Sequence, residues 1–184
     1  GFESGSDRIL TNIQKKATRL QNTRCMEIAH KYGLKVKALM SIGHAGESED
    51  TIRETCDWLL DVRPDDFDCT VITTYPGCPY HDFAVPDNRG NWIYTAKNGD
   101  RLYETEVDYT ESAQYYKGIP GDYVSHVYTD FLSGEELVQM RDWLETEVRQ
   151  QLDIPAMPLV PAKQFETSMG MLPSHLYRST NAPL

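Results

Sequence analysis

The sequence has no apolar run that approaches the ~20 residues of a transmembrane helix. It also lacks a basic start followed by a short apolar segment, which is the pattern of a secretory signal. These two absences argue against a membrane-embedded or exported class. They predict a soluble, cytoplasmic protein with no membrane partner.

Basic residues are fewer than acidic ones. The 184-residue chain has 18 lysines and arginines against 28 aspartates and glutamates, which gives a formal net charge of −10. Nucleic acids and anionic membranes attract proteins chiefly through basic surfaces. The charge balance therefore predicts that neither is the main partner.

Cysteine is scarce and scattered. No two of the four cysteines lie within four residues of each other, so the spacing of a structural metal site is absent, and the histidines show no ligand spacing either. We predict no metal site built by this chain. Cys25, Cys56 and Cys69 fall on expected helices and strands and are interpreted as small buried hydrophobic residues, whereas Cys78 lies in a loop.

Residues 1–85 alternate between helical and strand patterns. The first element is a short helix with Ile9 and Leu10 on one face, capped by Ser4 or Ser6. It is followed by a helix over about 18–32, a strand over 34–42, a helix over 48–62 that starts at Ser48, and a strand over 67–74. Such alternation predicts parallel strands joined by a helical crossover. The strand 34–42 becomes apolar on both faces and is expected to be covered on both sides. The expected buried stripe of the second helix is Cys25, Ile28, Ala29 and Tyr32.

After residue 85 the pattern changes. Asn98-Gly99 between two aromatic and β-branched runs predicts a hairpin over 92–104. A tyrosine-rich, irregular segment follows over 108–130, and a helix then runs over 133–152 from a capping box at Ser133 and Glu136. A proline-rich tail completes the chain. We therefore predict two domains, 1–85 and 86–184.

Residues suited to ligand binding fall where strands end. They are Glu3 with Ser4 after a strand expected upstream, "SIGHAGE" after Met40, and "TYPGCP" after Thr74. Ligands of parallel α/β folds bind at the carboxyl ends of the strands, so these segments are expected to share one rim. Glu3 has a carboxylate that can accept hydrogen bonds from two neighbouring hydroxyls. His44 either faces a substrate or is solvated.

In this order and spacing the segments resemble the C-terminal half of a radical S-adenosylmethionine enzyme barrel. The resemblance covers residues 1–83 and rests on "GFESGSDRIL" followed by "IQKKAT", on "AHKYGLKVKALMSIGHAGESEDTIRET" and on "DDFDCTVITTYPGCPYHD". It implies an α/β fold, the C-terminal half of a partial (βα)6 TIM-like barrel, followed here by a β-hairpin and a C-terminal helix. The tyrosine-rich segment and "FETSMGMLPSHLYR" resemble members that carry a cobalamin-binding domain upstream.

The resemblance also implies contacts with S-adenosylmethionine at three strand ends. The residues matched by position are Glu3 with Ser4 for the ribose or methionine part, Lys15 for the cofactor carboxylate, Met40 and Ile42 beside the adenine, and Tyr75 and Pro76 closing the adenine side.

The sequence departs from the family pattern in three places. His44-Ala45 stands where the family commonly has an apolar residue and proline, and Cys78 stands where it has threonine. The Cys-x3-Cys-x2-Cys loop that holds the [4Fe–4S] cluster is absent, and in the family it lies upstream of the turn that opens this chain. We therefore expect a fragment that folds, does not catalyse alone, and forms a homo-oligomer through edges exposed by the missing half.

The function implied by the resemblance is that of an iron–sulfur oxidoreductase or transferase that cleaves S-adenosylmethionine to a 5′-deoxyadenosyl radical. The cluster, and cobalamin in members that use it for methyl transfer, would be bound outside this chain. The chain itself would contact the adenine, the ribose and an unidentified small-molecule substrate.

The residues alone leave two other hypotheses open. One is a non-catalytic α/β domain whose acidic surface and tyrosine-rich segment bind another protein. The other is an unrelated barrel enzyme in which Glu3 is a general acid or base. Glu47 is then the one candidate for a second carboxylate, although it is better explained by its place at a helix start beside Ser48.

Overall fold

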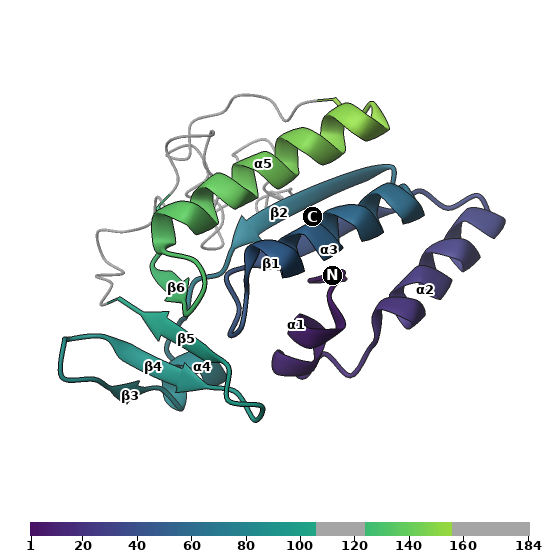
Figure 1. Ribbon diagram of the computed structural model, residues 1–184. Helices are drawn as coiled ribbons and strands as arrows, with labels where there is room; N and C mark the ends of the chain where they lie inside the picture. The colour runs from purple at the N-terminus through teal and green to yellow at the C-terminus, as the bar shows by residue number, and fades with distance from the viewer. Residues whose placement is uncertain (106–123, 156–184) are drawn as a thin grey trace, which may run out of the picture.

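A parallel pair of strands forms the centre of the protein. The computed structural model describes residues 1–105 and 124–155 (Figure 1). Strand β1 (Lys37–Ile42) pairs in parallel with β2 (Asp66–Val71), and helix α3 (Glu49–Val62) connects them. The predicted parallel pairing across a helical crossover is confirmed. The overall class is mixed α/β, with this two-stranded parallel sheet and a separate four-stranded antiparallel sheet.

The first residues extend the parallel pairing to the other side of β1. Glu3 forms a parallel bridge with Met40: the Glu3 N–H donates to the Leu39 carbonyl at 3.1 Å, and the Ser41 N–H donates to the Glu3 carbonyl at 2.9 Å. The "GFESGS" turn therefore leaves the sheet at the same end as the loops after β1 and β2.

Both strands are shorter than the sequence predicts, and β1 is less buried. The predicted ranges are 34–42 and 67–74, whereas the ladder runs over Lys37–Ile42 and Asp66–Val71. Alternate residues of β1 face the core, but Lys37 is exposed and Leu39 is 48% exposed. The prediction that β1 is covered on both faces is wrong, because the described residues cover only the face that holds Met40.

Capping residues fix the starts of the longer helices. Helices α2 (Arg19–Lys31), α3 and α5 (Gly134–Leu152) follow Thr18, Ser48 and Ser133, and each of these side chains accepts a hydrogen bond from the backbone N–H three residues later. The predicted starts of α3 and α5 are confirmed. Helix α1 (Asp7–Asn12) follows Ser6, whose side chain makes no capping bond.

The buried side of α2 differs from the prediction. Its buried residues are Asn22 and Met26, whereas Cys25 is exposed and Ile28 is 49% exposed. Because α2 lies at the edge of the molecule (Figure 1), a narrow line of residues makes its contacts and the apolar residues beside that line stay in solvent. The predicted stripe and the predicted burial of Cys25 are both wrong, while Cys56 and Cys69 are buried as predicted.

The antiparallel sheet follows the short helix α4 (Pro79–Asp82). Its strands, in sheet order, are β3 (Val85–Pro86), β4 (Trp92–Thr95), β5 (Arg101–Glu104) and β6 (Val127–Thr129). The predicted hairpin is confirmed, and its turn contains Gly99 at a φ of +90°. Residues 127–129, predicted as irregular, instead form β6, and 106–123 lie outside the described residues.

Helix α5 packs beside α3 over the parallel sheet (Figure 1). One hydrophobic cluster contains Met40 and Leu59 from the first part of the chain, together with Leu102, Val127 and Leu144 from the second. The predicted boundary at residue 85 thus crosses a shared core, and the division into two domains stays a prediction.

Two buried arginines of α5 cover the outer edge of β2. The Arg141 Nε donates to the Cys69 carbonyl at 3.0 Å, and the Arg149 Nη2 donates to the Phe67 carbonyl at 2.7 Å. Along a parallel strand alternate residues bond to opposite neighbours, and the Asp66 N–H donates to the carbonyl of Val36, the residue just before β1. The carbonyls of Phe67 and Cys69 therefore point away from β1, where the guanidinium groups satisfy them.

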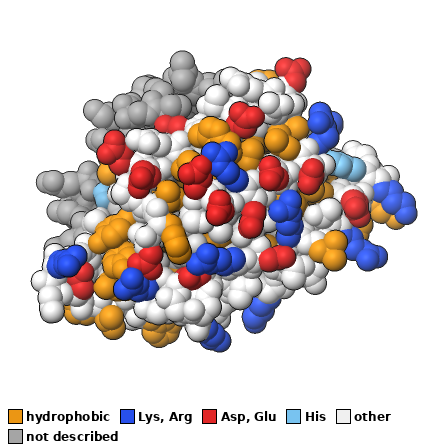
Figure 2. All heavy atoms as spheres, viewed as in Figure 1, with side chains coloured by type: hydrophobic (Ala, Val, Ile, Leu, Met, Phe, Trp, Pro, Cys, Tyr) orange, Lys and Arg blue, Asp and Glu red, His pale blue; other side chains and the backbone are white. Residues whose placement is uncertain are grey.

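Acidic side chains dominate the outer surface of α3. The helix carries Glu49, Asp50, Glu54, Asp57 and Asp61 but only one basic residue, Arg53. Figure 2 shows red side chains spread over this face with fewer blue ones between them. The face does not suit an anionic partner. Across 1–105 and 124–155, no helix is long and apolar enough to cross a membrane.

Asp100 joins the hairpin to the first part of the chain. Arg8 binds its two oxygens at 2.9 and 2.6 Å, and the Asn12 amide donates to it at 2.8 Å. A Cβ on Gly46, which has a φ of +82°, would collide with the Asp100 carboxylate. Hydrogen bonding to Arg8, opposed in part by burial, lowers the pKa of Asp100 from 3.8 to about 2.

We predict that Asp100→Asn lowers the free energy of unfolding at pH 7 by about 1–2 kcal/mol, allowing for solvent screening. A carboxyl with a lowered folded-state pKa stabilises the fold above its ordinary pKa, and this contribution disappears as the pH falls from about 4 to about 2. The variant should therefore lose less stability than the wild type over that range in urea titrations. Asp57→Asn, at an exposed position of α3, is the matched control. Equal acid sensitivity in wild type and Asp100→Asn would contradict the assignment.

Candidate functional site

The "GFESGS" turn holds Glu3 in an unusual backbone conformation. Glu3 has a φ of +67° although it is not glycine. Its neighbour Gly5 lies so close to α3 that an added Cβ would come within 2.7 Å of the Trp58 Cβ. The glycine is thus required by the close approach of this turn to the helix.

Ser4 anchors the same turn. It is buried, its hydroxyl lies 3.1 Å from the Thr55 hydroxyl of α3, and the Gly5 N–H donates to the same Thr55 oxygen at 3.0 Å. The structure therefore gives the Ser4 side chain a role in docking the turn on α3. Its predicted contact with a cofactor stays a prediction.

The Glu3 carboxylate has one partner on each oxygen. The Lys15 ammonium donates to Oε1 at 3.1 Å, and the Ser41 hydroxyl donates to Oε2 at 3.0 Å. Burial raises the pKa of Glu3, but the hydrogen bond and charge of Lys15 and the bond from Ser41 outweigh it, so the pKa is lowered. With its side chain 30% exposed, the ionised carboxylate keeps acceptor capacity for a ligand with two neighbouring hydroxyls.

His44 continues this set of contacts into the loop after β1. The ring is only 6% exposed, with Nε2 at 2.9 Å from the Ser41 hydroxyl and Nδ1 at 3.1 Å from the Tyr80 hydroxyl of α4. Burial lowers the pKa of His44 to about 4 against the opposing charge of Glu3. The solvated alternative for His44 is therefore wrong, because its ring is enclosed and bonded on both nitrogens.

The other predicted site residues lie in two places. The side chains of Met40 and Ile42 are 3% and 1% exposed and belong to the hydrophobic core, on the opposite face of β1 from Ser41. Tyr75 is half-buried and Pro76 is exposed in the loop before α4, and this loop reaches the site through Tyr80. Glu3 and Lys15 are in direct contact, while the adenine roles of the other four residues stay predictions.

Ser41 belongs to the "SIGHAGE" segment expected at the rim, but no role is predicted for it from the sequence, and Tyr80 lies just outside the "TYPGCP" segment. Because side chains alternate along a strand, Ser41 lies on the same face as the exposed Leu39. A polar residue on that face at the end of the strand could have been recognised as a site residue. Tyr80 gave no comparable signal, because its contact with His44 spans 36 positions and depends on the folded path of the loop.

Glu47 holds the "GHAGE" loop from inside. The side chain is 1% exposed, its Oε2 accepts from the Gly43 N–H at 3.1 Å, and its Oε1 accepts from the Thr51 hydroxyl at 2.6 Å. Burial raises the pKa of Glu47 to about 7, opposed by the hydrogen bonds from Thr51, His44 and Gly43. The carboxyl is wholly engaged in the loop and the start of α3, which supports the structural explanation over a catalytic one.

The described cysteines do not suit an iron–sulfur cluster. Cys25 is exposed, Cys78 is half-buried, and Cys56 and Cys69 are buried with thiol pKa values raised by burial. Over residues 1–105 and 124–155, no three histidine, cysteine or acidic side chains gather as a metal site. Cluster thiolates must come together around the iron, so this part of the chain does not fit the group.

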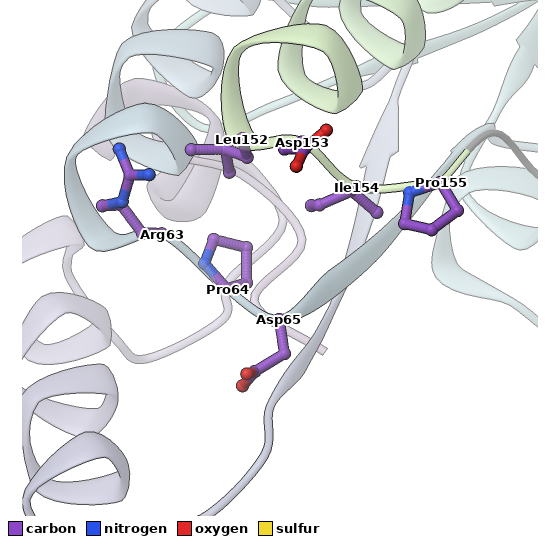
Figure 3. Close-up of a pocket in the computed structure, with 7 residues that line it drawn as sticks. All are labelled: Arg63, Pro64, Asp65, Leu152, Asp153, Ile154 and Pro155. Atoms are coloured by element: carbon purple, nitrogen blue, oxygen red, sulfur yellow. The ribbon is translucent and has the colours of Figure 1, made fainter.

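A shallow pocket lies at the other end of the sheet. It has a volume of about 260 Å³ and is lined by Arg63, Pro64 and Asp65 before β2, by Leu152 at the end of α5, and by Asp153, Ile154 and Pro155 after it (Figure 3). These residues flank the amino end of β2, whereas Glu3, Ser41 and His44 lie at the carboxyl end of the parallel pair. No predicted site residue lines this pocket.

Comparison with known proteins adds a functional class. No protein-family model matches the sequence. A protein of Methanocaldococcus jannaschii named provisionally as a methylthiotransferase is 26% identical over 150 residues, which is 77% of this chain and 33% of that protein. An uncharacterized methyltransferase of Pyrococcus horikoshii is 31% identical over 48% of this chain and 19% of its own length. The bacteriochlorophyllide d C-12(1)-methyltransferase of Chlorobaculum tepidum is 29% identical over 45% of this chain and 18% of its own length.

These distant relatives are methyl- or methylthiotransferases by name, which is consistent with a methyl-transfer enzyme family. The chain spans a third or less of the length of each of them.

We predict that Glu47 makes stability fall as the pH rises. A carboxyl with a raised folded-state pKa binds its proton more tightly in the folded state, so its contribution is full below pH 4.5 and is lost as the pH rises through about 7. The loss should approach about 2–3 kcal/mol. The amide of Glu47→Gln is uncharged, like the protonated acid; its oxygen can accept from the Gly43 N–H, and its NH₂ group can donate to the Thr51 hydroxyl oxygen. We therefore expect this variant to fold and to lose less stability between pH 5 and 8.

Urea denaturation across that pH range measures the effect. Glu27→Gln, an exposed change on α2, is the control and should keep the wild-type slope. An unchanged slope in Glu47→Gln would show that Glu47 is ionised in the folded protein throughout.

Proposed function

We propose that the chain is part of a radical S-adenosylmethionine enzyme that transfers a methyl or methylthio group, and that Glu3 is its principal contact with the cofactor. The observation that carries the proposal is the placement of an ionised, partly exposed carboxylate at the carboxyl end of a parallel strand ladder, beside two further strand-end loops. The names of the distant relatives support the methyl-transfer class. The partial (βα)6 barrel expected from the resemblance is part of the same proposal.

The residues of this chain would bind and orient the cofactor. S-adenosylmethionine supplies the transferable methyl group and, in radical enzymes, the 5′-deoxyadenosyl group. The Glu3 carboxylate would accept hydrogen bonds from the ribose hydroxyls, and Lys15 keeps that carboxylate ionised. Because Lys15 is bound to Glu3, its predicted pairing with the cofactor carboxylate would require both acidic groups to share one ammonium.

The iron–sulfur cluster belongs to another part of the full-length protein in this proposal. The described cysteines do not fit it, and the relatives are at least three times as long as the segment they share with this chain. Cobalamin, where a family member uses it, would likewise be bound outside this chain. Homo-oligomer formation and the small-molecule substrate stay proposals without a residue assigned to them.

The hypothesis of a barrel enzyme that uses Glu3 as acid or base has less support. Glu3 has a lowered pKa and a lysine partner, which disfavours a proton donor. Glu47, the candidate second carboxylate, is enclosed by its own loop.

We predict that the reading frame encoding the full-length protein contains a Cys-x3-Cys-x2-Cys segment upstream of Gly1. Three thiolates at this spacing are what the cluster requires, and this chain does not provide them. Sequencing of the complete reading frame is the measurement. A frame without the triad would refute the radical part of the proposal and leave only the methyl-transfer class.

We further predict that Glu3→Ala in the full-length protein weakens S-adenosylmethionine binding by about 1–3 kcal/mol, or about 5- to 150-fold in Kd. The reason is that the ribose hydroxyls would lose a charged acceptor. Isothermal titration calorimetry measures the change, and Glu27→Ala on the exposed side of α2 is the matched control. Equal affinity in wild type and Glu3→Ala would remove Glu3 from the site.

A further inference from the structure

A continuous line of hydrogen bonds joins three strand-end segments. The Tyr80 hydroxyl lies 3.1 Å from the His44 Nδ1, the His44 Nε2 lies 2.9 Å from the Ser41 hydroxyl, and the Ser41 hydroxyl lies 3.0 Å from the Glu3 Oε2. Tyr80 comes from α4 after β2, Ser41 and His44 from the end of β1 and the loop that follows it, and Glu3 from the opening turn. The set is called here the Tyr80–Glu3 relay.

The chemistry of its members fixes the direction of every bond. An ionised carboxylate only accepts, so the Ser41 hydroxyl donates its single proton to Glu3. The Ser41 oxygen must then accept from the Nε2–H of His44. A neutral imidazole has one N–H, so Nδ1 is the acceptor and Tyr80 donates to it.

The surroundings of His44 keep the ring neutral. It is 6% exposed, and Glu3, itself paired with Lys15, is the charged group whose field acts on it. A protonated ring would carry N–H groups on both nitrogens, and Tyr80 could then no longer donate to Nδ1. The relay as observed requires the uncharged ring with its proton on Nε2.

We propose that His44 is a positioning residue, held in its Nε2–H tautomer by Tyr80, and that it directs the Ser41 hydroxyl onto the carboxylate of Glu3. The relevance to a ligand rests on the proposed function of Glu3. The relay sets the orientation of Glu3 together with the position of the loop after β2. Glu3 and the loop that holds Tyr75 and Pro76 are both proposed to contact the same cofactor, and the relay therefore positions them together.

Removal of the Tyr80 hydroxyl shows how the relay would fail. Without a donor at Nδ1, the neutral imidazole of His44 can adopt the tautomer with its proton on Nδ1, and Nε2 then becomes an acceptor. The Ser41 hydroxyl would turn to donate to Nε2, and Glu3 would lose one of its two donors. A hydrogen bond to the charged form favours ionisation, so its loss raises the carboxyl pKa.

The test uses the 184-residue chain without any ligand. Nitrogen-15 spectra of the histidine rings should show Nε2 of His44 protonated and Nδ1 unprotonated in the wild type, and a population with Nδ1 protonated in Tyr80→Phe. Carbon-13 titration of the Glu3 carboxyl should show its pKa raised by about half a pH unit in Tyr80→Phe and by about one pH unit in Ser41→Ala. The phenylalanine keeps the ring that packs edge-on against Tyr94 at 4.8 Å.

Tyr103→Phe is the matched control, because it removes a hydroxyl that donates to a different carboxylate, Asp130, at 2.8 Å. It should leave the His44 tautomer and the Glu3 titration unchanged. A wild-type His44 protonated on Nδ1 would overturn the proposal. So would a Glu3 pKa that moves in Ser41→Ala but not in Tyr80→Phe, since Ser41 would then act without His44.

A binding measurement with S-adenosylmethionine tests the proposed function separately from this proposal. In the full-length protein, Tyr80→Phe should raise the Kd for S-adenosylmethionine about three- to tenfold, and Tyr103→Phe should not. If the full-length wild type does not bind S-adenosylmethionine, the proposed function fails. The ring spectra and the Glu3 titration still decide whether His44 positions the carboxylate.

Discussion

The backbone pairing of Glu3 with β1 is the constraint on which the candidate site depends. Hydrogen bonds on both sides of this residue, to Leu39 and from Ser41, fix its height along the strand. That register sets the Glu3 carboxylate directly beside the Ser41 hydroxyl, and from there His44 and Tyr80 follow.

Two carboxylates with internal hydrogen-bond partners keep the strand-end loops in place. Glu47 binds the loop after β1 from within, and Asp100 clamps the same loop against α1 from the hairpin. The two differ in their electrostatics: burial raises the pKa of Glu47, whereas Arg8 lowers that of Asp100. Some of the acidic residues of this chain therefore stabilise its loops through internal hydrogen bonds. Glu3 is more exposed than either, with 30% of its side chain exposed against 14% for Asp100.

Local signals predicted the elements well and the contacts between them poorly. The starts of α3 and α5 follow from Ser48 and Ser133, whose capping bonds involve only the next three residues. The side on which α2 is buried does not follow from its own residues, since its neighbours select Asn22 and Met26 over the more apolar Ile28. The pairing of Glu3 with Lys15 was within reach because both flank α1. The Tyr80–Glu3 relay required the folded positions of three separate segments.

The backbone hydrogen-bonding groups at the two edges of the parallel pair have different kinds of partner. On the β2 side, Arg141 and Arg149 bind the outward carbonyls, which blocks addition of another strand. On the β1 side, the described backbone partner is the short stretch at Phe2 and Glu3, which reaches Leu39 and Ser41 but not Lys37. Of the two edges of the parallel pair, the one beside β1 therefore has more room for a further strand. The same edge holds Glu3, so whatever pairs there also forms the next wall of the proposed cofactor site.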